Sequence, residues 1–204
     1  MSAATGPGIV APPLPAGGAP GEHSQSGGRF GDVFAAVAYG DPLGAPLLAD
    51  LEREYDARYG VEVFGEPAIV EINRYPAEAF APPHGLFLLL LRDGEPISGG
   101  AYMRYDDTTA EVKRVWTRPD LRGRGIAKLV LAELERRAAH AGYRRIYLTT
   151  GPRQPEAVGL YRSHGYTPLF DPALPAAEIG VHPFEKLLPP AVHAGPDTEQ
   201  EARP

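Results

Sequence analysis

Three arginines and two glycines stand just before a strongly helical stretch, within RPDLRGRGIAKLVLAELERRA (118–138). A helix N-terminus exposes unpaired backbone N–H groups and the positive end of the helix dipole, and glycine lets an anion approach that backbone closely. The segment from Arg122 to Ala127 therefore has the chemistry of a pyrophosphate site. A tight turn with solvated arginines would show the same pattern, because short glycine-rich motifs often match by chance.

Two other phosphate-binding motifs do not fit this segment. A phosphate-binding loop needs Lys-Ser or Lys-Thr after its second glycine, whereas Ile126 follows Gly125. The dinucleotide motif G-x-G-x-x-G fails at its sixth position, which is Lys128. The usual nucleotide motifs therefore do not account for the loop.

The composition excludes several classes of site. The chain has 20 Lys and Arg against 26 Asp and Glu, a net charge of -6, which argues against a nucleic-acid-binding surface spread over the whole molecule. It has no cysteine, so disulfides, thiolate metal sites and a cysteine nucleophile are excluded. His164 and His182 lack metal-ligand spacing with any acid, and no metal is expected. The sequence shows neither a secretory signal nor a membrane-spanning apolar run, so a cytoplasmic protein without a membrane partner is expected.

Composition also divides the chain into three parts. Residues 1–29 are dominated by Gly, Pro, Ala and Ser, with few large apolar side chains to offset the entropy lost on ordering. Residues 189–204 have the same character with additional acidic residues. We expect two disordered tails around one folded domain at 30–188.

The pattern of apolar residues and turn signals in the folded part predicts an α/β fold with a mixed sheet. Its early half predicts an antiparallel meander, in which Asp93-Gly94 is a hairpin turn signal. Its later half reads as strand, long amphipathic helix and strand, which implies a parallel pair with a right-handed crossover, flanked by helices. The expected strands are 33–40, 85–92, 96–105, 110–117, 144–150, 166–170 and 182–188. The expected helices are 45–59, 127–141 and 156–165, with a partly helical segment at 61–83.

Two linked motifs resemble those of the GNAT superfamily of acetyl-CoA-dependent N-acetyltransferases. The first, Arg122-x-x-Gly125-x-Ala127, is similar to that family's acyl-CoA signature, Arg/Gln-x-x-Gly-x-Gly/Ala. The second, PEAVGLYRSHGY (155–166), is similar to its Asn-x-x-Ala-x-x-Leu-Tyr-x-x-x-Gly-Phe signature, with Gln154 where the family usually has Asn. The resemblance covers roughly 33–188.

The resemblance implies where acetyl-CoA would bind. The family binds the pyrophosphate through backbone amides of the signature loop, and it pairs the pantetheine arm with the edge of the strand that precedes it. Gln154 is implied as a further contact. The implied cofactor-binding residues are Val115, Thr117, Arg122, Gly123, Arg124, Gly125, Ile126, Ala127 and Gln154.

The resemblance also implies catalytic roles. Tyr161 matches the family's proton donor to the departing thiolate, although a tyrosine there could merely pack on the helix face. Glu111 lies six residues before Thr117, on a strand where some family members carry a base. Strict strand alternation would put Glu111 on one face with Lys113 and Val115, so it could instead form a structural salt bridge with Lys113.

The expected function is transfer of acetyl from acetyl-CoA to a primary amine of a small molecule, by direct attack in a ternary complex because no cysteine is present. The alternatives are a protein lysine or N-terminal acetyltransferase and a non-catalytic acyl-CoA-binding module. Acceptor-binding candidates lie at 52–60, Glu71, Tyr75, Glu78 and His84. A homodimer is expected by analogy with family members.

Overall fold

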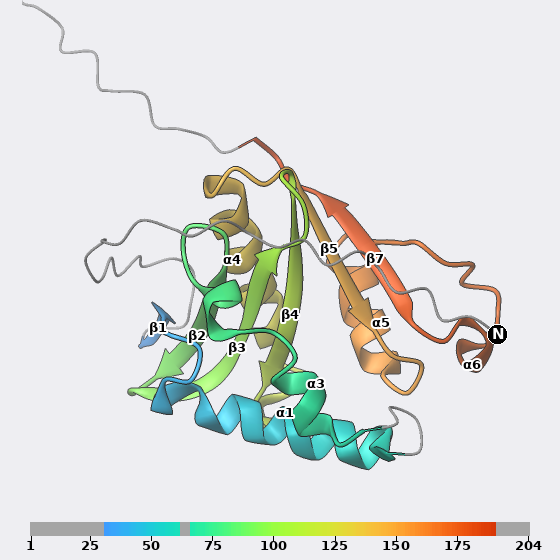
Figure 1. Ribbon diagram of the computed structural model, residues 1–204, viewed down its shortest axis with the longest axis horizontal. Coiled ribbons are helices and arrows are strands. Elements are labelled where there is room, and N and C mark those ends of the chain that lie inside the picture. Colours follow the sequence, from blue (N-terminus) through green and yellow to red (C-terminus); the bar gives the residue numbers. More distant parts are fainter. Residues whose placement is uncertain (1–30, 62–65, 191–204) are drawn as a thin grey trace, which may run out of the picture.

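The computed structural model describes residues 31–61 and 66–190. Within them the chain forms a seven-stranded sheet in the order β1-β2-β3-β4-β5-β7-β6 (Figure 1). All neighbouring strands are antiparallel except β4 and β5, which pair in parallel. This confirms the expected mixed sheet. The strands are β1 (Asp32–Ala36), β2 (Leu86–Arg92), β3 (Glu95–Arg104), β4 (Thr109–Thr117), β5 (Arg145–Thr150), β6 (Thr167–Pro168) and β7 (His182–Leu187).

Helices cover both faces of the sheet. The α-helices of the described residues are α1 (Ala45–Arg58), α3 (Ala68–Ile72), α4 (Ile126–His140), α5 (Pro155–Ser163) and α6 (Ala176–Ile179). One face carries α1 and α3, while α4 and α5 pack on the other. In the described ranges, no helix is long and apolar enough to cross a membrane. The tail expected at 1–29 and nearly all of that at 189–204 lie outside the described residues.

The two faces of the sheet explain its uninterrupted apolar strand. In β2, Leu88 and Leu90 join the core beneath α4, whereas Phe87 and Leu89 join the core beneath α1. All four side chains are fully buried, and a strand covered on both faces shows a continuous apolar run rather than alternation. The α4 stripe at Val130, Leu131, Leu134 and Ala138 is also fully buried, as its spacing predicts.

Local turn chemistry sets the register of the meander. Asp93 and Gly94 both have positive φ, 52° and 83°, which is the geometry of a tight hairpin whose twist matches its strands. The strand expected at 166–170 is shorter than predicted: Leu169 N still donates to the Pro183 carbonyl at 2.9 Å, but Pro183 has no N–H to return the bond. Helix α6 was not predicted.

A β-bulge in β4 departs from simple alternation. Ala101 of β3 faces Lys113, but Gly99, two residues away, faces Trp116, so β4 contains one extra residue. Arg114 sits in this bulge with φ 61°, a left-handed value that is rare outside glycine. The expectation that Val115 shares a face with Glu111 is therefore wrong: Val115 packs toward the α4 side of the sheet.

The bulge coincides with the point where β4 and β5 separate. Their parallel pairing runs from Thr109 opposite Arg145 to Val112 opposite Leu148 and goes no further. Beyond it, no strand of the described residues pairs with the edge of β4 that faces β5, and the two strands form a V. The elements around this opening position the candidate site.

Candidate active site

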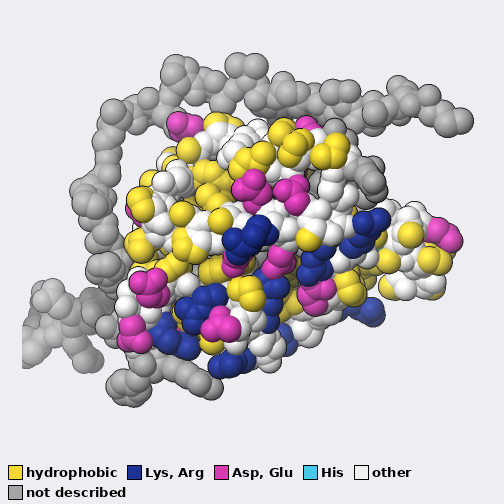
Figure 2. Space-filling view, turned by 90° about the horizontal axis from the view of Figure 1, so that it is seen from below, with side chains coloured by type: hydrophobic (Ala, Val, Ile, Leu, Met, Phe, Trp, Pro, Cys, Tyr) yellow, Lys and Arg dark blue, Asp and Glu magenta, His cyan; other side chains and the backbone are white. Residues whose placement is uncertain are grey.

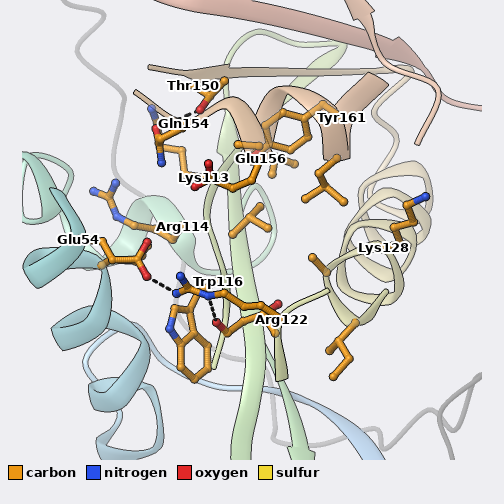
Figure 3. A pocket seen from close by; sticks show the side chains of 18 of the residues that line it. Glu54, Lys113, Arg114, Trp116, Arg122, Lys128, Thr150, Gln154, Glu156 and Tyr161 are labelled. Atoms are coloured by element: carbon orange, nitrogen blue, oxygen red, sulfur yellow. Dashed lines mark hydrogen bonds and ion pairs between the residues drawn. The ribbon is translucent and has the colours of Figure 1, made fainter. Parts of the chain in front are cut away.

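A cavity of about 560 Å³ lies at the open end of this V, and we call it the β4–β5 cavity (Figure 3). Helix α1 closes one side of it, the start of α4 another, and α5 a third. Both charged and apolar side chains line it. Its lining comprises Leu51, Glu54, Tyr55, Val112, Lys113, Arg114, Val115, Trp116, Thr117, Leu121, Arg122, Gly123, Gly125, Ile126, Ala127, Lys128, Thr149, Thr150, Gln154, Glu156, Ala157, Leu160 and Tyr161.

The loop before α4 presents its backbone to the cavity. Gly123 and Gly125 have φ values of 73° and 79°, which glycine adopts without steric cost. Within the described ranges, the amides from Gly123 to Ala127 donate to no backbone carbonyl, and they stand at the positive end of a 15-residue helix. The loop therefore offers unused donors to an anion.

The two loop arginines differ in what they contact. Arg122 Nε donates to the Thr117 carbonyl oxygen at 2.9 Å, and its Nη2 pairs with the carboxylate of Glu54 on α1. Arg124 does not line the cavity, and its Nη2 donates to the Asp120 carbonyl at 3.2 Å. The Arg122 side chain thus ties the loop to β4 and α1, so backbone amides, rather than free guanidinium groups, face the cavity.

Gln154 organises the turn between β5 and α5. Its Oε1 accepts from Thr150 Oγ1 at 3.0 Å, from the Gly151 amide at 3.1 Å and from the Tyr59 hydroxyl at 3.3 Å. Beside it, Arg58 at the end of α1 pairs with Glu156 at 2.5 Å. These contacts bridge α1 to α5 along the rim of the cavity. Figure 2 views the molecule from the α1 side, where Lys and Arg side chains lie beside Asp and Glu.

Tyr161 projects from α5 into the cavity lining and is only 7% exposed. Its ring lies 5.7 Å from that of Tyr166 and 5.6 Å from that of Phe184, measured between centroids. Burial raises the pKa of Tyr161 well above its usual value, and nearby Tyr55 raises it further. The phenol therefore stays neutral and keeps a proton to donate.

Glu111 is the one predicted catalytic residue that does not line the cavity. It is 8% exposed, and its Oε1 accepts from Lys113 Nζ at 2.8 Å. Lys113 does line the cavity, and its Nζ also lies 4.7 Å above the centre of the Tyr75 ring. Glu111 is thus separated from the cavity by one ion pair, the contact that its spacing from Lys113 had suggested.

The structure brings together most of the predicted site residues and adds others. Besides Tyr161 and Gln154, the cavity is lined by Val115, Thr117 and the loop from Arg122 to Ala127 except Arg124. The unforeseen members include Arg114, Lys128 and Glu156, while Glu54 and Tyr55 fall within the 52–60 candidates. Across the described ranges, His, Asp and Glu side chains form no group of three that could hold a metal ion.

Comparisons with known proteins show what the chain is similar to. Residues 47–166 match the sequence profile of the acetyltransferase (GNAT) family. An IAA acetyltransferase of Azospirillum brasilense is 33% identical over 112 residues, 48% of this chain and 73% of that protein. An uncharacterised N-acetyltransferase of Escherichia coli (strain K12) is 24% identical over 129 residues, 59% of this chain and 75% of that protein. The crystal structure of a GNAT family acetyltransferase from Elizabethkingia anophelis with acetyl-CoA bound has the same fold, with a TM-score of 0.56 at 15% identity over 78% of this chain and 100% of that chain.

Proposed function

The chain belongs to the acetyltransferase (GNAT) family and is a transferase, and we propose that it moves the acetyl group of acetyl-CoA to the primary amine of a small molecule. The observation that carries this proposal is the β4–β5 cavity. Among the described residues, a loop with unused amide donors, a strand edge without a neighbouring strand and a buried neutral tyrosine all meet there.

The residues present fit acetyl-CoA. The amides from Gly123 to Ala127 would accept the pyrophosphate, because they are unpaired and stand at a helix N-terminus. The β4 edge between Val115 and Thr117 would pair with the amides of the pantetheine arm, since β5 has diverged from it. When bound, acetyl-CoA supplies an acetyl thioester at the end of that arm.

The chemistry then requires three things of the chain. The amine nitrogen must be neutral to attack the thioester carbonyl, where the C–N bond forms and the C–S bond breaks. The departing thiolate takes its proton from the Tyr161 hydroxyl, and solvent then returns a proton to the Tyr161 phenolate. The proton lost by nitrogen passes to Glu111, directly or through water, once Glu111 is released from Lys113. No cysteine is available for an acetyl-enzyme, so attack is direct.

A small acceptor is favoured by the contacts along the rim. Arg58 Nη1 donates to the Arg153 carbonyl at 2.7 Å, and Arg58 Nη2 pairs with Glu156 at 2.5 Å. These contacts connect the end of α1 to the β5–α5 turn. This connection closes one side of the approach to the cavity, which favours a compact acceptor. A small amine would pass it more readily than a protein segment.

Initial-rate kinetics test this function. CoA thiol release would be followed with acetyl-CoA and a panel of small primary amines, together with a lysine-containing peptide and a peptide with a free N-terminus, with products identified by mass spectrometry. We expect turnover with small amines, and intersecting double-reciprocal lines from a ternary complex. Peptides as the better acceptors would contradict the small-molecule proposal, and acetyl-CoA binding without turnover on any amine would contradict transfer.

A further inference from the structure

Arg114 combines three unusual properties. It is only 5% exposed, it lines the β4–β5 cavity, and it holds a left-handed φ of 61° within the β4 bulge. A non-glycine residue in this conformation is strained, and such strain persists where the surrounding structure imposes it, often at binding sites. The bulge directs the Arg114 side chain from β4 toward α3 (Figure 3).

The hydrogen-bonding capacity of the Arg114 guanidinium is only partly used. Its Nη2 donates to the carbonyl oxygens of Glu71 and Ile72, each at 2.8 Å. Its Nε is buried and has no partner among the described residues. None of the described carboxylates lies within ion-pair distance of it, although a buried cation without a counter-charge is costly.

The other charged side chains of the cavity are mostly neutralised in pairs. Glu54 pairs with Arg122, Glu156 with Arg58, and Lys113 with Glu111. Among the cavity-lining residues that the structure describes, this leaves two cations without a carboxylate, Arg114 and Lys128.

These two cations lie at opposite sides of the cavity. Lys128 stands in the first turn of α4, next to the proposed pyrophosphate loop, whereas Arg114 lies toward α1 and α3 (Figure 3). Positive charge beside the phosphates is explained by acetyl-CoA. Positive charge at the far side is left for the other substrate.

Tyr55 connects Arg114 to the reaction centre. Burial raises the pKa of Tyr55 and the nearby positive charge of Arg114 opposes that rise, while Tyr55 in turn raises the pKa of Tyr161. The Tyr55 hydroxyl is therefore within electrostatic range of both residues. Arg114, Tyr55 and Tyr161 line the same cavity, so an acceptor held at Arg114 would extend past Tyr55 toward Tyr161.

We propose that Arg114 binds a carboxylate of the acceptor, so that the substrates are small primary amines that also carry a carboxylate, as amino acids do. The inference rests on the proposed acetyl transfer and specifies its acceptor. The carboxylate supplies the missing counter-charge and accepts from the unused Nε–H. Charge-assisted hydrogen bonds of this kind are short, strong and sensitive to replacement by a neutral group.

Matched acceptors test the proposal. CoA thiol release would be measured for a panel of L-amino acids and their carboxamides with wild type, Arg114→Gln, Arg114→Lys and the control Lys128→Gln. The decisive quantity is the acid-to-amide ratio of kcat/KM, compared between proteins, because a carboxamide also changes the basicity of the amine. We expect Arg114→Gln to lower this ratio by about 10- to 100-fold, through a higher KM for the acids.

The controls separate binding of the carboxylate from a structural role in capping α3. Lys128→Gln should raise the KM for acetyl-CoA and leave the acid-to-amide ratio of kcat/KM as in wild type. Arg114→Lys keeps the positive charge, so its acid-to-amide ratio should lie between those of Arg114→Gln and wild type. If Arg114→Gln lowers kcat/KM for acids and for amides by the same factor, Arg114 only supports the end of α3 and the proposal is overturned.

A binding measurement keeps the two proposals distinguishable. Amino acids should raise the melting temperature of wild type in the presence of CoA more than their carboxamides do, and Arg114→Gln should abolish the difference. Absence of turnover on every amine, with this difference intact, would overturn acetyl transfer but support the carboxylate site. If the enzyme turns over but the acid-to-amide ratio of kcat/KM is equal in wild type and Arg114→Gln, the carboxylate site is overturned and acetyl transfer still stands.

Discussion

Replacing Tyr161 with phenylalanine isolates one hydroxyl in the proposed mechanism. The ring is buried against Tyr166 and Phe184, with centroid distances of 5.7 and 5.6 Å, and phenylalanine would preserve both contacts. Loss of a single hydroxyl changes stability by about 1 kcal/mol. The Tyr161→Phe protein should therefore fold, and its activity would report on the hydroxyl alone.

The expected loss falls on kcat. A positioned general acid contributes about 10²- to 10⁴-fold to a rate, equivalent to roughly 3 to 5 kcal/mol of activation free energy. We expect kcat to fall at least 100-fold in Tyr161→Phe, since the hydroxyl acts when the thiolate departs. The KM for acetyl-CoA should change little, about threefold or less, because the proposed cofactor contacts are backbone amides and a strand edge.

A neighbouring tyrosine provides the matched control. Tyr166 is buried and in ring contact with Tyr161, but it does not line the cavity. The Tyr166→Phe protein should keep kcat within about threefold of wild type in the same thiol-release assay. Equal kcat values for wild type and Tyr161→Phe, or an equally large loss in both variants, would refute the reasoning.

The pH dependence of kcat adds a second readout for Tyr161. Burial raises its pKa above the ordinary value of 10.0, so the phenol should remain protonated throughout the working range. The wild-type enzyme should show no alkaline loss of kcat attributable to this group below about pH 10. An alkaline limb below that pH that disappears in Tyr161→Phe would contradict the assigned environment.

Three further perturbations follow from the structure. Gly125 has a φ of 79°, so Gly125→Ala should lower the free energy of unfolding by about 1–2 kcal/mol, and it should also raise the KM for acetyl-CoA. Gly159 in α5 has an ordinary φ, so Gly159→Ala should instead raise the free energy of unfolding by about 0.5–1 kcal/mol. Denaturant titration measures both stability changes. Glu54→Gln should raise the KM for acetyl-CoA several-fold by releasing Arg122, with a stability change of about 1 kcal/mol or less because the pair is solvent-accessible. Burial lowers the pKa of His164 in the folded state below its ordinary value of 6.5, so between the folded-state and unfolded-state pKa values the unfolded chain binds more protons. The contribution of neutral His164 to stability is therefore complete above about pH 6.5 and is lost as pH falls through the folded-state pKa. Urea titrations from pH 5 to 7.5 should show that the free energy of unfolding rises less steeply with pH in His164→Gln than in wild type.

Each of these predictions has a contrary outcome. Equal changes in the free energy of unfolding for Gly125→Ala and Gly159→Ala would mean that the backbone conformation of the glycine does not determine the effect of the substitution on stability. An unchanged KM for acetyl-CoA in Glu54→Gln would mean that the loop does not depend on its tie to α1. Identical pH slopes for wild type and His164→Gln would assign the acid sensitivity to other groups.

The elements that sequence predicts well are those set by nearby residues. The apolar stripe of α4 and the Asp93-Gly94 turn depend on spacing and local backbone preference, and both are found as expected. The parallel pairing of β4 with β5 follows from the strand, helix and strand order, because a crossover connection leaves few alternatives. Helix α6 was missed because its four residues are too short to show periodicity.

The site is predictable only where its residues are contiguous. The loop from Arg122 to Ala127 and the α5 segment that carries Tyr161 are each one short motif, and both line the cavity. The pairing of Glu54 with Arg122 joins residues 68 apart in sequence, and neither residue type nor local spacing signals it. Such contacts are fixed by how α1 packs across the sheet, which a local pattern does not contain.

One extra residue in β4 accounts for the main departures from the sequence-based site. Simple alternation placed Glu111 and Val115 on one face, but the bulge moves Val115 toward α4 and leaves Glu111 paired with Lys113. The same bulge lies where β4 leaves β5 and turns Arg114 toward the far side of the cavity. The opening that would admit acetyl-CoA and the cation that would select the acceptor thus lie at the same bulge, so a change that removes the bulge should disturb both substrates together.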